Sequence, residues 1–277
     1  MDWARAKSIL ILVFLTLNIF LLTYISIYRF GQGISRETIT DTVQILGTKG
    51  IVLECEIPLY NDATPRLVYR NGRFNRERIV QKLMGIPGLS AEEISSSMEL
   101  TAGDRKLVFT DENSFVFSDS APAGSMDISG KDGTEKLLRG FLEDIGLKVT
   151  GFRLDGYIQN DDGSVTCIFT EKYKKFMVFD NYIRVVVSGN GVSRIECKYR
   201  NVKGFSQDKV KVMPAHLVLL KNFGYGENTT VTGISIGFKG YGAEQNVMEY
   251  SEGPAWRITV KGSRPRYFKA SDGEEIK

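Results

Sequence analysis

The chain has 277 residues, of which 42% are hydrophobic and 25% are charged, and this ordinary balance excludes an intrinsically disordered protein. The formal net charge of +3 is too small to indicate a nucleic-acid-binding protein. Three cysteines exclude a disulfide-rich scaffold, and a single histidine, His216, argues against His-rich metal sites and catalytic triads.

The first long element is an apolar helix. Ser8 to Tyr28 contains 21 residues without a charged side chain. A helix of this length, rising about 1.5 Å per residue, crosses a hydrocarbon core about 30 Å thick. A secretory signal is usually shorter and ends at a small-x-small cleavage site, whereas this run ends in Tyr28, Arg29 and Phe30. The sequence therefore predicts an uncleaved transmembrane anchor over residues 8–28.

The orientation of the anchor follows from the charges that flank it. Arg5 and Lys7 precede the span, and Arg29 and Arg36 follow it, so the positive-inside rule gives only a small preference for a cytoplasmic N-terminus. We expect residues 1–7 to form a cytoplasmic tail and residues 29–277, after the span, to lie outside the cell.

Polar residues interrupt the anchor on one helix face. Heptad spacing places Asn18 on a stripe with five other residues: Ser8, Ile11, Leu15, Leu22 and Ile25. Because lipid offers an amide no hydrogen-bond partner, Asn18 favours contact with another membrane helix, and such contacts contribute on the order of 1 kcal/mol. The alternative is that Asn18 is tolerated without a partner. We predict that the six residues bind the transmembrane helix of a partner.

Residues 29–130 predict a first α+β module. A stalk helix is expected over residues 36–48, with Ile39, Val43 and Leu46 on one side. Asn75 suits the N-cap of a helix that ends at Met84, before Gly85. Strands are expected at 51–56, 67–70, 97–101, 106–110 and 114–118, and the last three form a meander. The small, turn-rich segment from residue 121 to residue 130 indicates a linker.

Residues 131–277 predict a second α+β module. Helices are expected over 133–146, ended by Gly146, and over 213–223, with Pro214 at its start. Half-polar alternation predicts antiparallel strands at 152–159, 164–173, 176–187, 192–200, 230–238, 255–261 and 266–270. Each half contains a helix followed by a three-stranded meander. The expected fold class is therefore α+β, with a transmembrane helix followed by two helix-on-antiparallel-sheet modules.

The sequence gives little support for catalysis. Ser206 begins an SxxK match to serine transpeptidases, but it lies in a predicted polar loop, and the third triplet of that signature is absent. His216 is surrounded by leucines and reads as a partly buried structural residue rather than a ligand or base. No P-loop, GxGxxG, HExxH or EF-hand pattern occurs. We predict no catalytic, cofactor-binding or metal-binding residues and no cofactor.

Two further features leave alternatives open. Cys167 and Cys197 lie in predicted strands, and either they form a disulfide or both are small buried hydrophobic residues. The run from Lys172 to Lys175 interleaves basic and aromatic residues. It either contacts an anionic wall polymer or lipid head groups, or it is the solvated face of a strand and its turn.

Both ends of the chain resemble one protein family. Met1-Asp2-Trp3 and the run from Phe14 to Leu22, together with the segments 253–258 and 267–274, are similar to the YycI (WalI) family of membrane-anchored regulators in low-GC Gram-positive bacteria. The C-terminal segments also look like the end of a PepSY-type module.

The resemblance implies a non-enzymatic regulator of the WalK/WalR (YycG/YycF) two-component system, which controls cell-wall homeostasis. Such a protein acts with YycH on the sensor histidine kinase WalK through contacts of its transmembrane helix and its extracellular domain. Leu15, Asn18 and Leu22 are then the expected kinase contacts. The alternatives are a PepSY-like extracytoplasmic inhibitor or wall-ligand sensor and, as a third class, a wall hydrolase or transpeptidase that uses Ser206.

Overall fold

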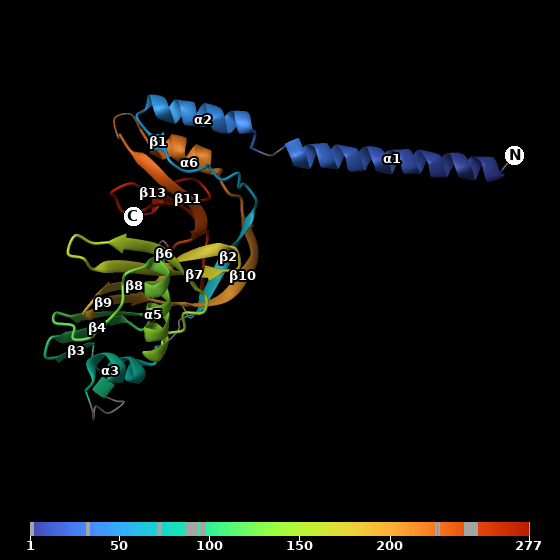
Figure 1. Ribbon diagram of the computed structural model, residues 1–277. Helices are drawn as coiled ribbons and strands as arrows, with labels where there is room; N and C mark the ends of the chain where they lie inside the picture. Colours follow the sequence, from blue (N-terminus) through green and yellow to red (C-terminus); the bar gives the residue numbers. More distant parts are fainter. Residues whose placement is uncertain are drawn as a thin grey trace.

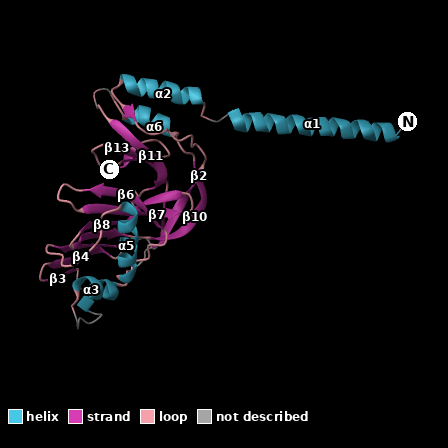
Figure 2. Ribbon diagram, viewed as in Figure 1, coloured by secondary structure: helices cyan, strands magenta, loops and turns pink. Residues whose placement is uncertain are grey.

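The computed structural model describes residues 3–31, 34–70, 74–86, 93–94, 98–224, 226, 228–240 and 249–276, and only the backbone at 4–5, 25–31 and 249–250. Figure 1 shows helix α1 (Trp3–Gly31) projecting away from a sheet-rich domain. Figure 2 shows helices α2 (Arg36–Thr48) and α6 (Ala215–Asn222) at the end of the domain nearest α1. Helices α3 (Arg76–Met84) and α5 (Lys131–Asp144) lie toward the opposite end.

Helix α1 contains one apolar stretch, Ala6–Tyr24, that is long and apolar enough to cross a membrane. None of this stretch is buried against the rest of the described chain. The helix predicted over residues 8–28 is confirmed as part of a longer helix.

Helix α2 has the predicted bounds, and two of its three predicted apolar residues, Ile39 and Leu46, face the core. Its N-cap is Ser35, whose side chain accepts a hydrogen bond from the Thr38 N–H. Thr42 and Leu46 are buried, whereas Val43 is 44% exposed. The predicted apolar side is therefore only partly correct, because α2 packs against α6 within the domain instead of standing as an isolated stalk.

The largest core lies between helices α3 and α5 and one face of an antiparallel array in the order β6-β7-β8-β9-β5-β4-β3. The strands are β3 (Glu99–Ala102), β4 (Arg105–Asp111), β5 (Ser114–Asp119), β6 (Phe152–Gln159), β7 (Val165–Tyr173), β8 (Phe176–Ser188) and β9 (Gly191–Lys198). Phe109, Phe115, Leu138, Leu142 and Phe169 are completely buried there. Alternation of apolar and polar residues along the strands produces this buried face.

The ends of these helices follow local rules. Asn75 accepts a hydrogen bond from the Arg78 N–H at the start of α3, and Gly85, at φ 63°, ends that helix. Gly146, at φ 94°, follows α5 and favours its termination. The predicted helix ends at Gly85 and Gly146 are confirmed within two residues.

A second core lies beneath α2 and α6. Strand β11 (Thr230–Phe238) pairs with β13 (Pro254–Val260), which continues to β14 (Arg266–Lys269) and β15 (Glu275–Ile276), all antiparallel. Strand β1 (Val52–Leu53) runs parallel to β11. Trp256 is fully buried, and its Nε1 donates a hydrogen bond to the Met213 carbonyl at 2.8 Å.

A small sheet connects these two parts. Strand β2 (Thr64–Arg70) lies between β10 (Asn201–Val210) and β12 (Glu249–Glu252), and both pairings are antiparallel. Parallel pairing of β8 with β11 joins the strands of the two cores into one large sheet. Leu67 and Tyr69 of β2 are buried against Phe176, Val178 and Phe238 of this large sheet.

Strand pairing crosses residue 130, where we predicted the boundary between two modules. Strand β5 precedes this position and pairs with β9, and α3 and α5 contribute to the same core. The two predicted meanders are present, but long-range pairing joins each of them to other elements. Strands β10 and β12 fall in segments that we predicted as loops, since bulges and polar residues disrupt the alternation of β10.

Candidate functional site

The predicted partner-binding stripe lies on a helix that the described domain leaves uncovered. The side chains of Ile11, Leu15 and Leu22 are 58–66% exposed, and Ser8 and Asn18 are exposed as well. The side chain of Ile25 lies outside the described residues. In water such an apolar surface would be unfavourable, so this helix is suited to lipid or to another protein.

Asn18 makes a hydrogen bond within its own helix. Its Nδ2 donates to the Phe14 carbonyl at 2.8 Å, much as the Thr16 hydroxyl donates to the Leu12 carbonyl at 2.8 Å. An asparagine amide has two N–H donors and a carbonyl oxygen with two lone pairs, so the bond to Phe14 uses one of four hydrogen-bonding positions. The other three can serve a second helix.

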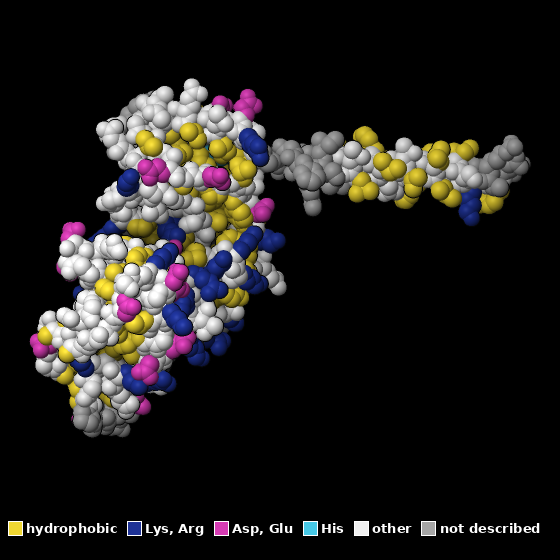
Figure 3. All heavy atoms as spheres, in the orientation of Figure 1, with side chains coloured by type: hydrophobic (Ala, Val, Ile, Leu, Met, Phe, Trp, Pro, Cys, Tyr) yellow, Lys and Arg dark blue, Asp and Glu magenta, His cyan; other side chains and the backbone are white. Residues whose placement is uncertain are grey.

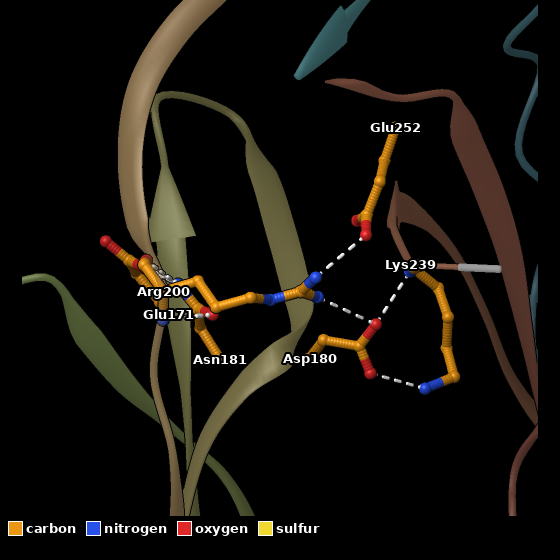
Figure 4. Close-up of polar contacts among 7 residues, drawn as sticks. Glu171, Asp180, Asn181, Arg200, Lys239 and Glu252 are labelled. Atoms are coloured by element: carbon orange, nitrogen blue, oxygen red, sulfur yellow. Dashed lines mark hydrogen bonds and ion pairs between the residues drawn. The ribbon is translucent and has the colours of Figure 1, made fainter. Parts of the chain in front are cut away.

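A buried ionic cluster lies inside the domain, at residues that no sequence pattern had indicated. Figure 4 shows Asp180, Arg200, Lys239 and Glu252 converging from four segments of the chain. Asp180 accepts hydrogen bonds from Lys239 Nζ at 2.6 Å, from the Gly240 N–H at 2.6 Å and from Arg200 Nη2 at 3.1 Å. Arg200 Nη1 donates to Glu252 at 2.9 Å.

Asp180 occupies the position at which β8 changes its neighbour. Met177 and Val178 pair with β11, whereas Tyr182 and the residues after it pair with β9. The adjacent Asn181 accepts from the Arg200 N–H at 2.9 Å and donates to the Arg200 carbonyl at 2.7 Å. Between the end of the β11 pairing and the start of the β9 pairing, the side chains of Asp180 and Asn181 bind the two segments that follow β11 and β9.

Burial and charge act in opposite directions on the two carboxylates. Burial alone would raise the pKa of Asp180, but the ion pairs with Lys239 and Arg200 lower it below the usual value. Burial raises the pKa of Glu252 despite its pair with Arg200. Two anions paired with two cations leave the cluster close to neutral, so it joins strands without exposing a reactive group.

Two glycines at this junction lie very close to their neighbours, Gly237 to a backbone carbonyl and Gly240 to a side-chain carboxylate. A Cβ on Gly237 would lie 2.3 Å from the Met177 carbonyl oxygen, and a Cβ on Gly240 would lie 2.2 Å from the Glu252 carboxylate. Neither distance is sterically allowed unless the Met177 backbone or the Glu252 side chain shifts. The signal for this site in the sequence is therefore a pair of glycines near the end of a strand, a pattern that ordinary turns and bulges also produce.

The other candidate residues are not brought together. Ser206 lies in β10, where its hydroxyl donates to the Asp208 carbonyl at 3.0 Å and accepts from the Arg66 N–H at 3.2 Å. His216 is buried in α6, and its burial lowers its pKa. Cys167 and Cys197 are buried free thiols on strands that flank β8. Within the described ranges, no group of three or more His, Cys, Asp and Glu side chains could hold a metal ion.

Several solved structures are distantly similar to the chain, including the three that follow. An uncharacterized protein from Eubacterium rectale has 10% identity and a TM-score of 0.49, with coverage of 82% of this chain and 91% of that chain. YycH from Bacillus subtilis has 16% identity and a TM-score of 0.46, with coverage of 77% and 52%. The YpeB C-terminal domain from Bacillus megaterium has 13% identity and a TM-score of 0.39, with coverage of 74% and 97%.

These structural similarities are too weak to carry a functional argument. No curated protein matches the chain in sequence. A family model described as YycI protein matches residues 31–270, which include almost the whole chain after α1. By this match, and in agreement with the resemblance at the two ends of the sequence, the chain belongs to the YycI family.

Proposed function

We propose that the chain is a non-enzymatic regulatory protein of the cell membrane. Acting with a YycH-like partner, it modulates the sensor histidine kinase WalK (YycG), which controls cell-wall homeostasis. Its N-terminus lies in the cytoplasm and its main domain lies outside the cell. Membership of the YycI family and the single apolar helix support this proposal.

The uncovered stripe on α1 is the observation that carries the proposal. Leu15, Asn18 and Leu22 present two apolar side chains and one amide on the same helix face. A transmembrane helix of the kinase would cover these side chains and use the remaining hydrogen-bonding positions of Asn18. If the contact differs between two signalling states, its differential energy sets the shift in their populations, and about 1 kcal/mol gives roughly a fivefold change.

Substitution of Asn18 tests the helix contact. We expect Asn18→Leu to weaken co-purification of the kinase with the full-length chain by about three- to fivefold, since a polar contact between membrane helices contributes about 0.6–1 kcal/mol. Thr16→Leu is the matched control, because Thr16 makes the same type of bond to its own helix but lies off the stripe. Equal co-purification of both variants with the kinase would exclude the stripe as the contact.

Removal of the anchor separates this proposal from its alternative. A chain that begins at residue 34 should lose its effect on the kinase while keeping its contact with the YycH-like partner through the extracytoplasmic domain. A PepSY-like inhibitor or wall-ligand sensor would instead act in solution without α1. An enzymatic role would require Ser206→Ala to abolish an activity, and we expect this variant to regulate the kinase normally.

A further inference from the structure

Lysines and aromatic rings lie together where the β7–β8 turn meets β10. Lys174 Nζ lies 5.0 Å from the centre of the Phe205 ring, and Lys175 Nζ lies 5.1 Å from the centre of the Tyr60 ring. The rings of Tyr173 and Phe205 pack edge to face with their centres 5.2 Å apart. Both lysines are exposed, so their ammonium groups remain accessible above the aromatic surface.

The charge around this cluster is strongly one-sided. Segments 64–70, 172–175 and 201–211 contain eight Lys and Arg residues and one acidic residue, Asp208, whereas the whole chain has a net charge of only +3. We name the eight cations the basic face: Arg66, Arg70, Lys172, Lys174, Lys175, Lys203, Lys209 and Lys211. All of them except the half-buried Arg66 are exposed. Figure 3 shows Lys and Arg side chains gathered on the flank of the domain below the end of α1 that lies nearest the domain.

Covalent geometry keeps the domain close to the end of α1. Helix α1 ends at Gly31 and α2 begins at Arg36. Five residue steps span at most about 18 Å, even when fully extended. With α1 in a bilayer, the domain therefore stays beside the lipid head groups, and the effective concentration of those groups is high. Strands β2 and β10, which carry much of the basic face, lie on the side of the domain toward α1 in Figure 1.

We propose that the basic face docks onto anionic lipid head groups of the bilayer in which α1 lies. Each lysine near an anionic bilayer favours the docked state by roughly fivefold, and the attraction acts only within about a Debye length. Tyr60 and Tyr173 suit the interface, because a tyrosine has an apolar ring and a polar hydroxyl. Docking fixes which surface of the domain faces the bilayer and which surface remains open to other proteins. The proposal rests on the membrane location of α1 but requires no kinase or YycH-like partner.

Fluorescence quenching in nanodiscs measures this docking directly. The full-length chain, with Cys55→Ser and a fluorophore on Gln207→Cys in β10, is placed in discs that contain a lipid with a spin-labelled head group. We expect stronger quenching in discs of phosphatidylcholine and phosphatidylglycerol than in phosphatidylcholine alone. The difference should disappear in about 1 M salt, where the Debye length is only about 3 Å. A label at Asn190→Cys, in the β8–β9 turn, should show no dependence on lipid charge.

Charge variants identify the residues responsible. Replacement of Lys172, Lys174 and Lys175 by Gln should reduce the ratio of docked to undocked domain on the order of 100-fold, since three lysines are neutralised. Replacement of Lys131, Lys136 and Lys148 by Gln removes the same charge from the part of the domain around α5 and should leave the quenching unchanged. The salt dependence of quenching in the chain that keeps all its lysines tests the proposal even if a triple variant does not fold.

Three results would overturn the inference. Quenching that is independent of lipid charge would exclude docking to anionic head groups, and equal effects of the two triple variants would exclude the basic face as the docking surface. If soluble polyglutamate changed the fluorescence of the label at position 207 in phosphatidylcholine discs as strongly as phosphatidylglycerol does, the basic face would be a site for anionic polymers. Failure of the chain to enter discs at all would instead contradict the membrane span in the proposed function.

Discussion

The guanidinium of Arg200 lies 3.1 Å from the carboxylate of Asp180, and this ion pair connects the segment between β9 and β10 to the position at which β8 changes its neighbour. The side chains of Arg200 and Asp180 are only 10% and 9% exposed. Glu252 of β12 and Lys239, which follows β11, join the same cluster. The pair therefore stabilises the junction between the small sheet of β2, β10 and β12 and the strands β8 and β11 of the large sheet.

Loss of Arg200 should therefore destabilise the domain strongly. We expect Arg200→Met to lower the free energy of unfolding by about 3–5 kcal/mol, because Asp180 and Glu252 would keep buried charges with too few partners. Arg184→Met is the control, since the Arg184–Glu196 pair is 42% and 26% exposed and such pairs contribute about 0–1 kcal/mol. Urea denaturation of both variants measures the difference, and equal losses would show that the buried cluster has no special role.

Gly237 provides a test of the close approach between β8 and β11. Gly237→Ala should destabilise the domain by about 1–3 kcal/mol or more, because its Cβ would lie 2.3 Å from the Met177 carbonyl oxygen. In the same strand, a Cβ on Gly233 would meet Thr259 at an ordinary 3.6 Å. Thermal melts of the two alanine variants should therefore separate clearly. A similar melting temperature for both would mean that β8 and β11 are less tightly packed than described.

His216 predicts a specific pH dependence of stability. Burial lowers the pKa of His216 below its ordinary value of 6.5, so the unfolded chain binds the proton more readily than the folded chain. Stability from this group is fully present above pH 6.5 and is lost as the pH falls toward and through the folded pKa.

Because His216 is the only histidine, the difference between the original chain and His216→Gln isolates this effect. Urea denaturation at several pH values should show a steeper loss of stability below pH 6.5 for the original chain than for the variant. Parallel pH profiles of stability for the original chain and the variant would contradict the lowered pKa of His216. A pKa at or above 6.5 in an NMR titration of the imidazole would contradict it as well.

The three thiols should react in a fixed order. Cys167 and Cys197 are both buried, and burial raises the pKa of Cys167 to about 11 and that of Cys197 further, whereas Cys55 is only partly buried. A thiol reagent at neutral pH should label Cys55 first and reach the other two only after denaturation, because the thiolate is the reactive form. Mass spectrometry of the labelled chain checks this order, with Cys55→Ser as the control. Fewer than three reactive thiols in denaturant without reductant would indicate a disulfide.

The helices and most strands could be predicted from local sequence, for physical reasons that act over a few residues. Asn75 caps α3 through its own side chain, and Gly85 and Gly146 adopt backbone conformations that other residues avoid. Strand β11 was predicted with its observed bounds, because its alternation is regular. By contrast, β10 contains two register shifts and a polar composition, so its pairing with β2 left no clear local pattern.

Local sequence is enough to predict the long apolar helix, the α+β class and the stripe of residues around Asn18, because helix periodicity and hydrophobicity are local properties. The pairing of β5 with β9, the packing of α2 on α6, and the cluster of Asp180, Arg200 and Glu252 follow from contacts between distant segments. These residues are charged, and charged residues usually lie on the surface. Whether such side chains are solvated or buried together depends on which distant strands are adjacent, and no short segment contains that information.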